Sequence, residues 1–265
     1  MHTHQPARRR RAIPILLALA LLAAPRGGAA ASAPGRPDPR ALVKAAIDYW
    51  RGTSSDSVVE MTIHRPDWER TLVLRVLTLG SDRTLVRVLA PKKDAGTGTL
   101  LVKGTMWSFS PKVNRVIRIP ASMMHQSWMG SDFSNNDVAR SDEIVDRYRH
   151  RLLGVERDGG REVYVVESVP LESAPVVWGR EVVRIRDDEV LLGHDFYDQD
   201  GRLVKRMRTL EVRVMGGRPT AARQRMEKVE APGEWTEVRV RRVAYGARIP
   251  EAAFTLSALR NPRRF

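Results

Sequence analysis

The stretch GTMWSFSPKVNRVIRIPASMMHQSWMGSDFSNNDV, residues 104–138, decides how the rest of the chain is organised. It begins with two short strand patterns, Met106–Phe109 and Arg115–Ile119. The residues between them, Pro111 to Asn114, are typical of a hairpin connection. Pro120 ends the second pattern, and the residues after it mix large apolar side chains with Ser, Gly and Asn. The stretch therefore predicts a β-hairpin followed by an irregular apolar segment.

The irregular segment has two interpretations. Methionine side chains adapt to partners of irregular shape, and tryptophan adds a large apolar area with one polar edge. A segment rich in both can form a mobile apolar surface. It can equally be a loop that packs a small core of its own. Composition does not decide between the two.

Outward from this stretch, apolar residues recur with a period of two for most of the chain, which is typical of β-strands. Turn signals separate the patterns, for example Asp158-Gly159-Gly160 and Gly216-Gly217. Helical spacing occurs only at Arg40–Trp50, Asp142–Tyr148 and Pro250–Leu259. We therefore predict a mainly β (α+β) fold, a single curved antiparallel sheet that forms an unclosed β-barrel with helices covering its mouth. The predicted strands are Val58–His64, Arg70–Leu79, Arg83–Leu89, Thr99–Lys103, the hairpin above, Arg151–Arg157, Glu162–Val169, Arg180–Arg186, Leu191–Tyr197, Leu203–Val214, Thr220–Val229 and Trp235–Tyr245.

The N-terminus has the pattern of an export signal. Arg8 to Arg11 precede an apolar run, Ile13 to Ala24, and small residues follow. We predict a signal peptide over residues 1–31, a single domain over residues 32–265 and a periplasmic location. Retention of the signal as an anchor is the alternative. The chain contains no cysteine, so neither disulfides nor an N-terminal lipid attachment are available.

The formal net charge is +14, and it falls to +9 when the five arginines of the predicted signal are removed. Nucleic-acid binding requires basic and aromatic residues gathered on one face. Here the arginines alternate with apolar residues along strand patterns such as Val182–Arg186. A solvated sheet face or an anionic partner such as lipid headgroups explains this better, and we expect no nucleic-acid partner.

Five stretches stand out beyond the strand pattern: Tyr49–Ser55, Met61–Arg70, Arg87–Thr97 with Met106-Trp107, Met129–Ser134 and Ile249–Thr255. Together they resemble the larger LolA-like proteins of outer-membrane lipoprotein sorting. The resemblance covers essentially the whole predicted mature chain. It implies an unclosed antiparallel barrel over helices, with an apolar cavity that carries acyl chains across the periplasm. Because the lipidated receptors of the superfamily need a cysteine, it favours a soluble carrier.

The apolar bulk at and after the hairpin predicts a lipid-binding surface. Strand alternation allows only one of the two pairs Met106 with Ser108 or Trp107 with Phe109 to face inward, and we expect the latter. The short polar residues Ser131, Asp132 and Ser134 are expected to organise the loop. The candidate lipid-binding residues are Trp107, Phe109, Ile117, Ile119, Met123, Met124, Trp128, Met129 and Phe133.

No spacing of catalytic or ligand residues points to an enzyme, a cofactor or a metal. Gly130–Ser134 lacks the Gly-x-Ser-x-Gly of a nucleophile elbow, and Asp198–Gly201 reads as a turn. We predict a monomeric carrier that binds acyl chains of a lipoprotein or lipid. An inner-membrane transporter would be its donor and an outer-membrane protein its acceptor, with residues 121–136 as a movable lid. The alternatives are a lipid-ester hydrolase using the same cavity and a docking module for a membrane lipid transporter.

Overall fold

A computed structural model describes residue 2 and residues 35–139, 142–174 and 176–261. The described residues from Pro37 onward form one compact unit. Apart from His2, the predicted signal peptide lies outside the described residues.

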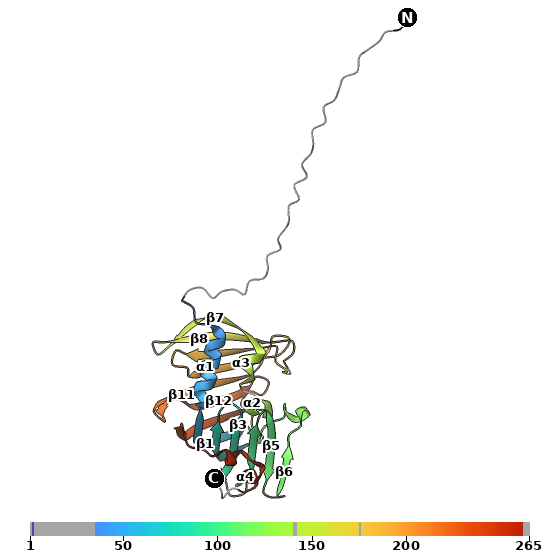
Figure 1. Cartoon of the computed structure of the whole chain (residues 1–265), viewed down its shortest axis with the longest axis vertical. Coiled ribbons are helices and arrows are strands. Elements are labelled where there is room, and N and C mark those ends of the chain that lie inside the picture. The colour runs from blue at the N-terminus through green and yellow to red at the C-terminus, as the bar shows by residue number, and fades with distance from the viewer. Residues whose placement is uncertain (1, 3–34, 140–141, 175, 262–265) are drawn as a thin grey trace. The chain divides into compact units, whose positions relative to one another are not determined.

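One antiparallel sheet of thirteen strands makes up the domain (Figure 1). Its order is β6-β5-β4-β3-β2-β1-β13-β12-β11-β10-β9-β8-β7, so the first and last strands of the chain pair at the centre while β6 and β7 form the two free edges. The predicted fold is confirmed as a mainly β, unclosed antiparallel sheet with a few short helices. The strands are β1 (Ser54–Arg65), β2 (Trp68–Leu79), β3 (Arg83–Ala90), β4 (Gly98–Val102), β5 (Thr105–Ser110), β6 (Arg115–Arg118), β7 (Tyr148–Asp158), β8 (Arg161–Pro170), β9 (Arg180–Arg186), β10 (Leu191–Tyr197), β11 (Leu203–Met215), β12 (Arg218–Lys228) and β13 (Trp235–Tyr245).

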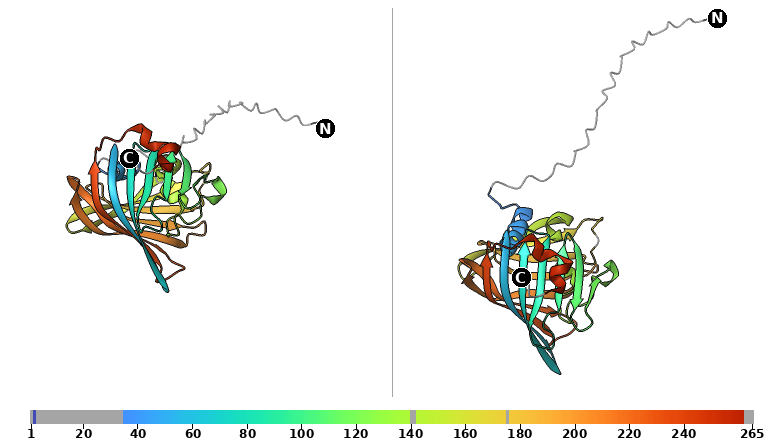
Figure 2. Two further views of the ribbon diagram at one scale, coloured as in Figure 1. Left: turned by 90° about the horizontal axis from the view of Figure 1, so that it is seen from below. Right: turned by 60° about the horizontal axis from the view of Figure 1, so that its bottom comes forward.

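The sheet curves strongly, and the β1–β2 hairpin extends beyond its neighbours (Figure 2). Residues directly opposite each other on paired strands share a face. The face that carries Met61, Leu72 and Val166 is called the inner face below, and the opposite one the outer face. Both faces of β2–β5 hold buried apolar residues, for example Leu74 on the inner face and Leu77 on the outer face. Each face of this part of the sheet therefore needs a cover.

Helix α1 (Pro39–Arg51) covers the inner face at the β7–β9 end of the sheet. Asp38 caps it by accepting a hydrogen bond from the amide of Arg40 at 3.1 Å. Val43 and Ala46 of α1 pack with Ile144 of α3 (Glu143–Arg147) and with Val166 and Val183 of the sheet. Neither helix belongs to the apolar cluster on the inner face of β1–β5, which is covered by another part of the chain.

The C-terminal segment covers the outer face of β2–β5. It consists of the 3-10 helix η2 (Glu251–Phe254) and α4 (Leu256–Arg260), and it lies over these strands in Figure 1. Phe254 and Leu259 pack with Leu77, Leu85 and Leu100. A Cβ atom on Gly98 would lie 2.8 Å from Cδ1 of Leu259, so a larger residue at this position would require the Leu259 side chain to shift.

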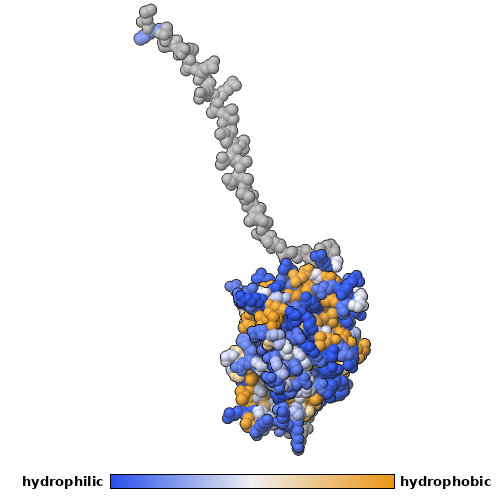
Figure 3. Space-filling model, turned by 180° about the vertical axis from the view of Figure 1, so that it is seen from behind, coloured by the Kyte–Doolittle hydropathy of each residue, from blue (hydrophilic) through white to orange (hydrophobic). Residues whose placement is uncertain are grey.

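The surface seen from behind is largely hydrophilic, with apolar side chains gathered in separate patches (Figure 3). Among the described residues, no helix has the length and the apolar character needed to cross a membrane.

Candidate functional site

The crossing segment, residues 119–139, leads from the end of β6 towards β7 and covers the inner face of β1–β5. Within it only η1 (Ala121–Met123) and α2 (Asn135–Ala139) are helical, so irregular backbone forms most of the cover. Its own backbone is closed by hydrogen bonds from the Trp128 amide to the Phe133 carbonyl, at 2.7 Å, and from the Asn136 amide to the Met124 carbonyl, at 2.8 Å. The segment is a compact plug and not an extended strap.

The apolar side of the crossing segment fills the inner face. Met124 and Trp128 pack against buried residues from five strands, and the Trp128 side chain is 8% exposed. The indole Nε1 of Trp128 donates to the Thr99 hydroxyl at 3.1 Å, which satisfies its one polar group. Of the predicted lipid-binding residues, the structure gathers Ile119, Met124, Trp128 and Met129 here. The sheet side of this cluster consists of Met61, Ile63, Leu72, Leu74, Val86, Val88, Leu101 and Met106.

The prediction that Trp107 and Phe109 face inward is wrong. Both lie on the outer face and pack beneath the C-terminal segment. Their neighbour Met106 points inward and packs with Met124 and Trp128. Both faces of β5 carry apolar residues in the sequence. Only the positions of the crossing segment and the C-terminal segment decide which of these residues contacts which segment.

Three further candidates lie at the margin of the site. Ile117 sits on the free edge strand β6 and is half exposed. Met123 is also exposed, and Phe133 is only partly buried outside the apolar clusters. The structure therefore does not bring these three side chains into the packed inner face.

Asp132 ties the crossing segment to the centre of the sheet. Its two carboxylate oxygens accept hydrogen bonds from Nη1 and Nη2 of Arg65 at 3.1 and 3.0 Å. The Thr236 hydroxyl donates to the same carboxylate at 2.7 Å and accepts from the Asp132 amide at 3.0 Å. Asp132 is only 3% exposed. Arg65 ends β1 and Thr236 lies on β13, so this contact fastens the plug to the two central strands.

Ser131 and Ser134, the other residues expected to organise the loop, bond within the crossing segment. The Ser131 hydroxyl donates to the Trp128 carbonyl at 2.7 Å. Ser134 and Asp137 form a reciprocal cap at the start of α2. The Ser134 amide donates to the Asp137 carboxylate at 2.7 Å, and the Asp137 amide donates to the Ser134 hydroxyl at 3.1 Å. None of these contacts resembles a nucleophile next to a base.

A buried polar band, which the sequence analysis did not predict, separates the two apolar clusters of the inner face. Glu181 on β9 accepts from the Tyr148 hydroxyl and contacts Nε2 of His194, both at 2.5 Å. Burial, followed by the nearby charge of Glu181, raises the pKa of the Tyr148 hydroxyl well above its ordinary value. On β11, Lys205 pairs with Asp137 of the crossing segment at 2.5 Å. Strand pairing places Glu181, His194 and Lys205 on the inner face, but alternation along the sequence does not show that they are buried.

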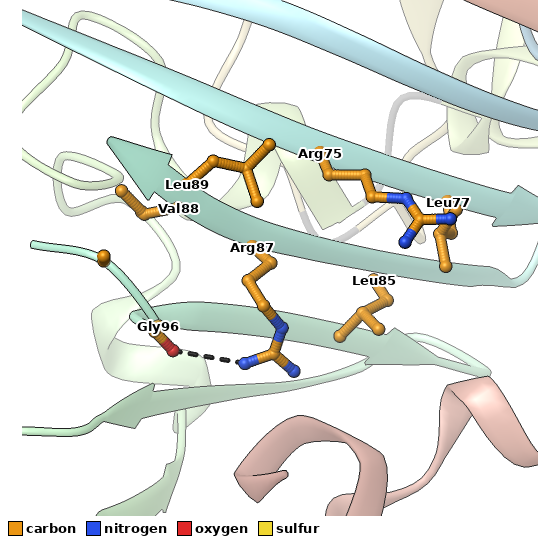
Figure 4. A pocket seen from close by; sticks show the side chains of 8 residues that line it. Arg75, Leu77, Leu85, Arg87, Val88, Leu89 and Gly96 are labelled. Carbon is orange, nitrogen blue, oxygen red and sulfur yellow. Dashed lines mark hydrogen bonds between the residues drawn. The ribbon is translucent and has the colours of Figure 1, made fainter. Parts of the chain in front are cut away.

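A pocket of about 380 Å³ opens on the outer face, beside the C-terminal helix (Figure 4). Leu77, Leu85 and Leu89 line it together with Arg75 and Arg87. Arg87 donates to the carbonyls of Gly96, Ala258 and Leu259, and Arg75 forms a bidentate pair with Asp56. Both guanidinium groups are therefore engaged, and this pocket is the lesser candidate.

No cluster of three or more potential metal ligands occurs within the described parts of the chain. Asp198 accepts hydrogen bonds from the amides of Asp200 and Arg202 at 3.0 and 2.8 Å, which is a turn.

A family model, described as "Uncharacterized protein", matches residues 80–261, which is more than half of the chain. The chain belongs to this family. The match begins at residue 80, directly after β2, and includes the crossing segment and the C-terminal segment. No curated protein matches the chain.

Three solved structures share the fold. A DUF1329 family protein from Desulfovibrio piger is 28% identical, with a TM-score of 0.75 over 84% of this chain and 100% of that one. A domain described as outer membrane lipoprotein-sorting, from Vibrio parahaemolyticus, is 21% identical, with a TM-score of 0.74 over 84% and 98%. A LolA superfamily protein from Nitrosomonas europaea is 22% identical, with a TM-score of 0.69 over 84% and 100%. The resemblance to LolA-like proteins that the sequence indicates is confirmed in the fold.

Proposed function

We propose that this protein is a periplasmic carrier that binds the acyl chains of a lipoprotein or lipid and moves them towards the outer membrane. One observation carries the proposal. The apolar inner face of β1–β5 is covered by a mostly irregular segment of the same chain, which fills it with Met124, Trp128 and Met129. An acyl chain could replace these side chains on a surface that is already apolar.

The energetics favour such an exchange over simple filling of an empty cavity. Burial of an acyl chain stabilises by about 0.8 kcal/mol per CH₂, so a chain of about fifteen carbons could approach about 12 kcal/mol. A carrier that bound so tightly would release its cargo slowly. Displacing the crossing segment exposes Met124 and Trp128 and breaks the contacts of Asp132. The free energy lost in this way offsets part of the gain from burying the acyl chain.

The fold supports the same proposal. The Vibrio and Nitrosomonas proteins, described as lipoprotein-sorting and LolA superfamily proteins, share it over most of the chain. By analogy, an inner-membrane transporter would load the carrier and an outer-membrane protein would receive the cargo, with the carrier acting as a monomer. The work would be binding, transfer and release, without covalent chemistry.

The test is mass spectrometry of the lipids that co-purify with the protein after export. We expect an intact acylated species. Hydrolysed products would indicate a lipid-ester hydrolase instead, and the absence of any bound lipid would indicate a docking module for a transporter. The matched control is a variant whose crossing segment is tethered to β13 by a disulfide before the cargo can enter, and it should carry no lipid.

A further inference from the structure

Lys205 is a charged group enclosed within the domain. It is 4% exposed, and its ammonium nitrogen lies 2.5 Å from Oδ2 of Asp137. The nitrogen also lies over the aromatic rings of Trp178 and Phe196, 5.0 and 4.6 Å from their centroids. Within the part of the chain that the structure describes, Asp137 is the only carboxylate that pairs with it.

A second lysine lies directly opposite the first. Lys205 on β11 and Lys228 on β12 are cross-strand partners, so both side chains leave the same face of the sheet. Lys228 has no carboxylate within ion-pair distance among the described residues. Two like charges in register destabilise a sheet unless an anion lies near them. Asp137 provides that anion, and it comes from the crossing segment and not from the sheet.

The crossing segment therefore presents two kinds of chemistry to the inner face. Met124, Trp128 and Ala139 fill the apolar cluster, and Asp137, two residues before Ala139, neutralises Lys205. A molecule that takes the place of this segment must supply apolar groups to the cluster and an anion to Lys205. The segment itself has this composition, which is that of an anionic amphiphile.

We propose that Lys205 is the headgroup site of the carrier and that its ligands are anionic amphiphiles, with Asp137 occupying the site in the empty protein. This inference rests on the proposed function, since it assumes that the crossing segment yields to a ligand. A neutral ligand would bury Lys205 without a counter-ion, which is strongly unfavourable. An anion on the ligand restores the pair, so Lys205 selects for charge while the apolar face selects for the acyl chain.

Arg65, unlike Lys205, does not require an anionic group on the ligand. When Asp132 withdraws, Arg65 keeps Glu234, whose Oε2 lies 3.1 Å from its Nε. Lys205 has no such second carboxylate among the described residues. The requirement for an anionic group is therefore local to β11.

The experiment measures displacement of a fluorescent fatty acid from the delipidated protein by palmitate, a monopalmitoyl phosphate ester and methyl palmitate. The first two carry the two anions that fit a buried ammonium, and the third has the same acyl chain as palmitate but a neutral methyl ester in place of the carboxylate. We expect at least one of the anionic ligands to bind about tenfold or more tightly than the ester, and the stronger of the two identifies the headgroup as carboxylate or phosphate. Inorganic phosphate alone should not compete.

Substitutions at the two partners should act in opposite directions. Lys205→Met should weaken anionic ligands by about tenfold and leave methyl palmitate unchanged or improved, whereas Lys205→Arg should keep the preference. Asp137→Asn removes the internal competitor and should tighten anionic ligands. The double variant Lys205→Met with Asp137→Asn removes both members of the buried ion pair, so it should fold even where Lys205→Met does not, and it should show no preference for charge.

The outcomes separate this inference from the proposed function. Equal binding of palmitate and methyl palmitate, unaffected by Lys205→Met, would overturn the anionic site but leave the carrier intact. Failure of all three lipids to bind would overturn both. Weaker anionic binding in Asp137→Asn would show that Asp137 supports the site and does not occupy it, and it would also overturn the inference.

Discussion

Arg65 and Asp132 form a bidentate ion pair between the end of β1 and the plug that covers the inner face, with N–O distances of 3.1 and 3.0 Å. Two parallel hydrogen bonds between a guanidinium and a carboxylate fix the relative orientation of both groups. Asp132 is nearly inaccessible to solvent, so the pair cannot be replaced by water while the plug is in place. Any movement of the crossing segment away from the sheet must break this pair.

Arg65→Met should therefore destabilise the domain strongly, because it leaves a buried carboxylate without its counter-ion. We expect a loss of about 3–5 kcal/mol in the free energy of unfolding, measured by urea denaturation. The control is Arg202→Met, which removes an exposed pair with Asp200 and should cost about 0–1 kcal/mol. Equal losses in the two variants would show that the Arg65 pair is not an anchor.

Ser131→Ala tests whether the Gly-Ser-Asp-Phe-Ser motif is structural. The Ser131 hydroxyl donates to the Trp128 carbonyl, and the side chain is buried. Its loss should lower the free energy of unfolding by about 1 kcal/mol. Hydrolysis of a lipid ester by the purified protein should be absent before and after the change. Ester hydrolysis that vanished in Ser131→Ala would make this residue a nucleophile instead.

The sequence predicted all thirteen strands because apolar residues alternate along them with a period of two and turn residues bound most of them. It did not predict which face of β5 meets the crossing segment, since Met106 on one side and Phe109 on the other are both apolar and both become buried. Nor could it pair Lys205 with Asp137, which are 68 residues apart and meet only because the crossing segment returns over the sheet. Strand periodicity is a local property, whereas the cover of each face depends on long connections.

His150 should make stability depend on pH. Its Nδ1 lies 2.9 Å from the Ser168 hydroxyl, and burial lowers the pKa of the imidazole below its ordinary value. As the pH falls, the imidazole therefore takes up its proton at a higher pH in the unfolded chain than in the folded one. The stabilisation linked to neutral His150 is complete above a pH of about 6.5 and is lost as the pH drops from there towards the folded-state pKa.

The measurement is the urea midpoint as a function of pH. His150→Gln should flatten the dependence below a pH of about 6.5, whereas His125→Gln, at an exposed position of the crossing segment, should leave it unchanged. A wild-type profile that both substitutions leave intact would assign the dependence to other groups.

Arg87 should hold the C-terminal segment on the outer face. Its Nη2 donates to the Ala258 and Leu259 carbonyls at 2.8 and 3.0 Å, where the last turn of α4 leaves carbonyl groups unpaired. Arg87→Met should speed amide hydrogen exchange in residues 251–260 while β9 and β10 keep their protection. Arg83→Met is the matched control, because Arg83 pairs with the exposed Glu251 of the same segment and should contribute little. Similar exchange in both variants would show that apolar packing alone holds the segment.

A disulfide between the crossing segment and β13 should arrest the carrier. Asp132 and Thr236 touch through both backbone and side-chain atoms, at 3.0 and 2.7 Å, so cysteines at these two positions should lie close enough to bridge. The chain has no other cysteine, so only this bond can form. We expect the oxidised variant to take up and release a fluorescent lipid far more slowly than its reduced form. The reduced form is the matched control, because it also lacks the Arg65 pair and differs only in the tether. Unchanged rates on oxidation would mean that the crossing segment is a fixed part of the core and that cargo enters elsewhere.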